Sequence, residues 1–287
     1  GEWLVEKKYE ASPEALRLLL QAVQNVETRS PVPVNGIENV VRDMLKERQR
    51  IEIYTGDEKP AKAYYIGGPT LDGIGTYMLM DLGEKTAKKP YITYIPSVRA
   101  YLTGRYDAKL LHWRSVWIYR QNRETIKDVK ITYHNVDSLQ SFSIEKEVND
   151  SFKFYNYKHE LATPQPKQLL LAQYLDFYSE LSIEAFKNDD EGKDSILKNG
   201  TFCTISLTDV KGKNKTVELY RAPVTSASMV RTAPDGRPLK YDIEKFYLLF
   251  NNKEDFALAQ YYVWAKTLRG YDEFLQHNAK PILNNNK

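Results

Sequence analysis

The sequence predicts an α+β fold made of two similar units, each an antiparallel sheet of short strands packed against one or two helices. Two observations carry this prediction. One stretch recurs about halfway along the chain, and short apolar runs follow one another with only turn residues between them. Strands joined by short turns pair antiparallel. We expect the first unit at residues 1–122, without its leading hairpin, and the second at residues 123–287.

The recurrence is visible when GEWLVEKKYEASPEALRLLLQAV is aligned with DSFKFYNYKHELATPQPKQLLLAQY. Matching Trp3 to Phe154 brings Pro13 onto Pro164 without a gap, and the leucine triplets that follow coincide. Further matches occur in the same order, TYMLMDLGEK with FYLLFNNKED and VRAYLTGRYD with VWAKTLRGYD. The pattern predicts an internal duplication.

Each copy is expected to place a helix after this opening. Ser12 and Thr163 are of the type that caps a helix, and the proline after each suits the first helical position, where a missing N–H costs nothing. Apolar residues then recur with helical spacing, at Leu16, Leu19, Leu20 and Val23 in the first copy and at Leu171, Tyr174, Leu175 and Tyr178 in the second.

A second helix is expected over NGIENVVRDMLKER, residues 35–48. Asn35 would cap it, and Glu38 three residues later would complete a capping box. One face of this helix carries its apolar residues, namely Ile37, Val40, Val41, Met44 and Leu45.

The strands are predicted from short β-branched and aromatic runs bounded by Gly, Asp and Pro. In the first copy they are IEIY, KAYYIGG, TYMLMDL and PYITYIP. In the second they are TFCTISLTDV, KTVELYRAP and KFYLLF, followed by FALAQYYVWAKTL as a strand that turns into a helix. Between the copies lie VWIY, VKITYH, FSIEKE and FKFYNY.

Composition excludes several classes of protein. The 287 residues carry 41 Lys and Arg against 38 Asp and Glu, a net charge of +3 that does not favour a nucleic-acid partner. No stretch approaches the roughly 20 apolar residues that cross a bilayer. Cys203 is the only cysteine. It excludes an intramolecular disulfide, and its alternating apolar surroundings predict a small buried side chain.

The familiar chemical motifs are absent or misplaced. GGPTLDGIGT leads into a strand, whereas a phosphate loop leads into a helix, so we expect a hairpin loop. GKNKT is expected to be a turn, and NDDEGKDS an acidic surface loop, because lysines occupy the end positions of its calcium-loop register. No zinc-helix or nucleophile-elbow motif occurs. We therefore expect no cofactor, no metal and no catalytic residue that the sequence identifies.

The most distinctive composition is LLHWRSVWIYRQNR, where aromatic and arginine side chains interleave. Such a mixture can bind sugars, anionic polymers or single-stranded nucleic acid by stacking and charge. The other interpretation is a strand whose aromatics fill a contact between the copies, which is where clefts often form. The candidate binding residues are Trp113, Arg114, Trp117, Tyr119 and Arg120.

These features together resemble a known family. The capped helix after a Trp-bearing strand, then PVPVNGIENVV, AYYIGGPTLDGIGTYMLM, PYITYIP and HWRSVWIY, are similar to envelope proteins of Bacteroidetes-type bacteria catalogued as domain of unknown function 4340. The resemblance implies an extracytoplasmic region behind a single N-terminal membrane anchor, on the periplasmic face of the inner membrane. It also implies an envelope or transport-associated protein partner. It supplies no catalytic residue.

From the sequence we therefore expect a non-enzymatic binding or scaffolding module of the bacterial cell envelope, tethered by an anchor that precedes this chain. Two alternatives stay open. One is a hydrolase of envelope polymers that uses carboxylates converging in space. The other is a soluble protein that binds carbohydrate or peptide.

Overall fold

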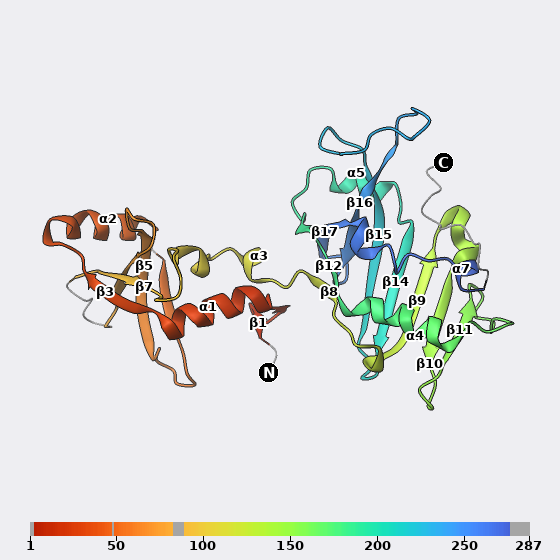
Figure 1. The fold of residues 1–287 in the computed structure, drawn as a ribbon, viewed down its shortest axis with the longest axis horizontal. Coiled ribbons are helices and arrows are strands. Elements are labelled where there is room, and N and C mark those ends of the chain that lie inside the picture. Colours follow the sequence, from red (N-terminus) through yellow and green to blue (C-terminus); the bar gives the residue numbers. More distant parts are fainter. Residues whose placement is uncertain (1–2, 48, 83–88, 276–287) are drawn as a thin grey trace. The chain divides into compact units, whose positions relative to one another are not determined.

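The computed structural model describes residues 3–47, 49–82 and 89–275, and it divides into two compact units (Figure 1). Ser115 is the last residue of the first unit and Val116 the first of the second. Both combine helices with antiparallel sheets, so the α+β class is confirmed. The division precedes the expected one after residue 122, because strand β8 (Trp117–Tyr119) pairs with β12 (Leu181–Ser182) of the second unit.

The first unit is built on a five-stranded antiparallel sheet with the order β3-β7-β6-β5-β4. Four strands follow one another as a meander, and β3 pairs with the last of them. Strands β4 to β7 correspond to the four predicted strands, and β3 was not predicted. The bounds are β3 (Glu27–Pro31), β4 (Arg50–Ile53), β5 (Lys62–Pro69), β6 (Thr76–Met80) and β7 (Tyr91–Tyr94).

The helices of this unit confirm one predicted cap and correct another. Helix α1 begins at Pro13, and the Ser12 hydroxyl accepts a hydrogen bond from the N–H of Ala15 at 3.3 Å, as predicted. Asn35 does not cap α2. It lies within a 3-10 turn that runs directly into the helix, so no free helix end is left beside it. The bounds are β1 (Leu4–Val5), β2 (Tyr9–Glu10), α1 (Pro13–Asn25), η1 (Val34–Gly36), α2 (Ile37–Glu47), η2 (Thr103–Tyr106) and α3 (Leu110–Trp113).

The core of the first unit lies between α1, η2 and the sheet. Its buried members are Ala22, Tyr64, Ile66, Met78, Ile95, Leu102 and Tyr106. The predicted leucine face of α1 is only half-buried, and the buried positions of that helix are Ala15 and Ala22. Small residues let the helix approach the sheet closely. The spacing of the leucines does not show that the alanine positions are the ones that become buried.

The second unit is built on an eight-stranded antiparallel sheet with the order β11-β10-β9-β14-β15-β16-β17-β13. The long connection between β15 and β16 extends beyond the end of the sheet (Figure 1). The strands are β9 (Ile126–Tyr133), β10 (Phe142–Lys146), β11 (Phe152–Asn156), β13 (Ala185–Phe186), β14 (Cys203–Asp209), β15 (Asn214–Pro223), β16 (Tyr241–Phe250) and β17 (Asp255–Gln260).

Helix α4 covers this sheet and confirms its predicted face, because Leu171, Tyr174 and Leu175 are buried, as is Tyr178 in the 3-10 turn that follows the helix. Its predicted start is wrong. The helix begins at Gln168, and the Thr163–Pro164 peptide is cis. The helical segments are η3 (Arg123–Thr125), η4 (Asn135–Gln140), α4 (Gln168–Asp176), η5 (Phe177–Ser179), α5 (Lys193–Lys198), α6 (Tyr261–Trp264) and α7 (Asp272–Leu275).

The later start of α4 follows from contacts with strand β11. Residues 162–165 run beside strand β11, where the N–H of Ala162 and the side chain of Gln165 bond to the backbone of Phe154. These contacts hold the chain in a non-helical conformation where the sequence alone suggests a helix. The strand-then-helix prediction for 256–268 is confirmed by β17 and α6.

The two units share one order of elements. In the first, α1 is followed by β3, α2 and the meander β4 to β7, whose last strand pairs antiparallel with β3. In the second, α4 is followed, after the short strand β12, by β13, α5 and the meander β14 to β17, whose last strand pairs antiparallel with β13. The second unit adds β8 to β12 around this arrangement.

Candidate functional site

Two of the predicted binding residues, Trp113 and Arg114, belong to the first unit and are held inside it. The N–H of Ser12 donates to the carbonyl of Trp113 at 2.7 Å, and the indole Nε1 of Trp113 donates to the carbonyl of Asp107. Arg114 is buried, and its guanidinium lies 3.7 Å from the centre of the Tyr9 ring. Both side chains therefore contribute to packing.

The other three, Trp117, Tyr119 and Arg120, belong to the second unit. Tyr119 is buried, and its hydroxyl donates to the carbonyl of Lys215 at 2.9 Å, so it is a core residue. Trp117 is half-buried, and the exposed Arg120 lies 5.8 Å from the centre of its ring. The five residues are thus divided between two units, and only Arg120 is exposed.

A different surface, on helix α2, exposes apolar side chains. Met44 is buried on the inner side of the helix, whereas Leu45 is 56% exposed although the sequence placed it on the same face. Val41 and Ile37 precede Leu45 by one and two turns and are half-buried. These three side chains line a shallow groove on the helix surface together with Glu38, Arg42 and Lys46. We call Ile37, Val41 and Leu45 the α2 stripe.

The charges beside the α2 stripe are mostly positive toward its C-terminal end. Arg42 donates to the side chain of Asn39 at 2.8 Å, and Lys46 pairs with Asp43 at 3.0 Å. Both pairs are exposed, so each interaction is weak and the two cations stay accessible to a ligand. An apolar strip with a basic border is suited to an amphipathic protein segment that carries acidic residues.

The α2 stripe was not identified from sequence. The sequence did hold an indication of it, because the apolar arc of this helix is wide. Five apolar residues in one short helix are more than the helix needs to pack one row of side chains against a sheet. Val34, in the turn before the helix, adds a further exposed apolar side chain. Which part of such an arc stays uncovered depends on packing.

The buried ionisable groups of the second unit are arranged for packing. The predicted burial of Cys203 is confirmed, and this burial raises the pKa of its thiol far above the usual value. Burial likewise raises the pKa values of Tyr119, Tyr133 and Tyr174. The hydroxyls of Tyr133 and Tyr174 donate to backbone carbonyls of Arg269 and Thr267, and both stay neutral at physiological pH.

Two of the segments that resemble ligand motifs form the expected connections between strands, whereas NDDEGKDS is only in part a loop, because helix α5 begins at its Lys193. GGPTLDGIGT connects β5 to β6, and GKNKT connects β14 to β15. Within residues 3–47, 49–82 and 89–275, no three His, Cys, Asp or Glu side chains are grouped so that they could hold a metal ion. No helix in the same ranges is both long and apolar enough to cross a membrane.

The comparisons with known proteins returned no relatives. No family model matches the chain, and neither the curated proteins nor the solved structures contain a significant match. The resemblance to domain of unknown function 4340 therefore stays a prediction.

Proposed function

We propose that this chain is a non-enzymatic binding or scaffolding module of the bacterial cell envelope. The observation that carries the binding role is the α2 stripe, where Leu45 and its neighbours expose an apolar strip bordered by Arg42 and Lys46. The partner we propose is a segment of an envelope or transport-associated protein with an apolar face and an acidic border. The apolar side chains would supply affinity, and the cations would set orientation.

Site-specific photo-crosslinking tests this role. A photoreactive amino acid is placed at position 41 of the α2 stripe, or at Asp43 as a control, in the chain expressed in its own host. Asp43 is exposed and, by helical spacing, projects from a different side of α2. We expect one defined adduct with another envelope protein from position 41 and none from position 43. Equal labelling from both positions, or an adduct only with a second copy of the chain, would contradict the proposed partner.

The extracytoplasmic location and the membrane tether rest on the family resemblance. We propose that an N-terminal anchor preceding residue 1 holds the module on the periplasmic face of the inner membrane. Protease treatment of spheroplasts tests this directly. The chain should be degraded in intact spheroplasts and should sediment with inner membranes. Protection from protease until the cells are lysed would contradict it.

We further propose that the two units arose by duplication. The shared order of helix, strand, helix and four-stranded meander supports this, as do the sequence matches that fall on equivalent strands. Tyr77 and Tyr247 are both half-buried on the third strand of their meanders, and Leu79 and Leu249 are both buried two residues later. Relatives of residues 1–115, once collected, should detect residues 116–287 as homologous. Detection of an unrelated family instead would contradict the duplication.

A further inference from the structure

Strand β11 lies at one edge of the eight-stranded sheet and pairs only with β10 among the described strands. An edge strand presents unpaired N–H and C=O groups that another strand can bind. The segment Phe152–Asn156 reads FKFYN, which is rich in aromatic residues and carries a single charge. Such a strand is well suited to edge-to-edge pairing. The opposite edge is formed by β13, which has only two residues.

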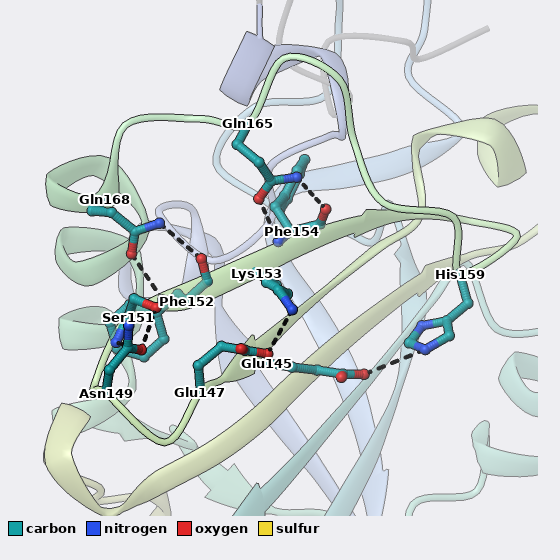
Figure 2. A network of polar contacts seen from close by, with 10 residues as sticks. All are labelled: Glu145, Glu147, Asn149, Ser151, Phe152, Lys153, Phe154, His159, Gln165 and Gln168. Carbon is teal, nitrogen blue, oxygen red and sulfur yellow. Dashed lines mark hydrogen bonds and ion pairs between the residues drawn. The ribbon is translucent and has the colours of Figure 1, made fainter.

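Two glutamine side chains occupy the outer edge of β11 (Figure 2). Gln168 Oε1 accepts from the N–H of Phe152, and Gln168 Nε2 donates to the carbonyl of Phe152, each at 2.8 Å. Gln165 repeats this arrangement at Phe154, at 3.0 Å and 2.9 Å. Each carboxamide therefore makes the pair of bonds that a residue of a neighbouring strand would make.

The backbone between β11 and α4 occupies the remaining outward groups of β11. The N–H of Ala162 donates to the carbonyl of Phe154 at 3.0 Å, and the N–H of Asn156 donates to the carbonyl of Glu160 at 2.9 Å. The N–H of His159 donates to the carbonyl of Asn156 at 2.9 Å. The outward backbone groups of Phe152, Phe154 and Asn156 are all engaged within the chain, so no additional strand can bind there without displacing these contacts.

We propose that Gln165 and Gln168 form a latch that prevents strand β11 from pairing with β11 of a second copy of this chain. A second copy fits this edge because the segment is self-complementary in an antiparallel pair. A two-fold axis at Phe154 would place Phe154 opposite its counterpart and Phe152 opposite Asn156, once residues 159–162, which bond to the backbone of Phe154 and Asn156, have left the edge together with the two glutamines. The single charge, on Lys153, would then lie diagonal to its counterpart rather than directly opposite it.

The test compares the wild-type chain with the double variant Gln165→Ala/Gln168→Ala and with Gln173→Ala. Gln173 is an exposed glutamine of helix α4, the helix that Gln168 begins, and serves as the matched control. Amide hydrogen exchange at Phe152 and Phe154 reports whether the edge has opened, and sedimentation velocity over a wide concentration range reports association.

At low concentration, the double variant should exchange both amides faster than wild type and the control. At high concentration it should form a dimer in which both amides regain protection. A double variant that exchanges quickly yet sediments like the control, or a dimer that leaves the two amides exposed, would overturn the proposal. Unchanged exchange would overturn it as well. Should the double variant not fold cooperatively, Gln168→Ala alone applies the same test at Phe152.

Discussion

The guanidinium of Arg114 stacks 3.7 Å from the centre of the Tyr9 ring, and residues 113–115 run antiparallel to residues 10–12. This contact ties the end of the first unit to its beginning. Since Arg114 is buried, the stacking operates with little competition from water, where such contacts are strongest.

Replacing Arg114 should therefore destabilise the first unit. We expect Arg114→Ala to lower the free energy of unfolding by about 1–3 kcal/mol, because it removes both stacking and buried packing. Arg120→Ala, from the same predicted binding segment but exposed, should change it by less than about 0.5 kcal/mol. Denaturant unfolding of both variants checks this. Equal and negligible effects would favour the binding role that the sequence suggested for Arg114.

Gly67 sets the distance between helix α2 and strand β5. A Cβ at this position would lie 2.6 Å from Cγ of the buried Met44, whereas a Cβ at Gly68 would meet no atom within 4 Å. Gly67→Ala should lower the free energy of unfolding by about 1–3 kcal/mol by overpacking, and Gly68→Ala should be far milder. Thermal unfolding of the two variants gives the comparison. A Gly68→Ala variant as unstable as Gly67→Ala would show that backbone freedom, and not the approach of α2, decides the cost.

Cys203 should be unreactive in the folded chain. It is fully buried on β14, and burial raises the pKa of its thiol, so almost no thiolate exists at neutral pH. A thiol reagent such as DTNB should react only as fast as the second unit unfolds. Addition of denaturant should release one equivalent of thiol. Rapid labelling of the native chain would show that β14 is accessible.

Asp72 gives the β5–β6 loop a measurable dependence on acid. The hydroxyl of Thr70, the N–H of Ile74 and the guanidinium of Arg29 hold the pKa of its carboxyl well below the usual value. A lowered pKa in the folded state stabilises the fold above the unfolded value, about 3.9, and this contribution fades as the pH falls further.

Asp72→Asn should therefore be less stable than wild type at neutral pH, and the difference should narrow as the pH falls below about 4. Denaturant unfolding of both chains across this pH range measures it. A difference in the free energy of unfolding that does not change with pH would mean that the substitution acts through the loop geometry and not through the charge.

The sequence was informative where structure is determined locally. The Ser12–Pro13 pair marks the start of α1, and β-branched and aromatic runs mark the meander strands, because capping and strand propensity act over a few residues. The start of α4 was mispredicted since Thr163–Pro164 has the same local signal. The contacts of Gln165 and Gln168 with β11, which override that signal, join residues that are distant in the sequence.

The candidate site was harder to predict for the same reason. Arg114 and Tyr119 have the composition of a binding surface, yet Tyr9 and the carbonyl of Lys215 engage them in the folded units. Conversely, Leu45 shares a helical face with the buried Met44 but remains exposed. Periodicity identifies an apolar arc, and only packing determines how much of that arc is covered.

Binding of a protein partner by the α2 stripe can be measured as the affinity of the chain for the protein crosslinked from position 41. We expect Leu45→Glu to weaken binding by about tenfold or more, while Asp43→Ala binds like wild type and both variants keep the wild-type melting temperature. A Leu45→Glu chain that folds normally and binds with wild-type affinity would contradict the proposed role of this surface.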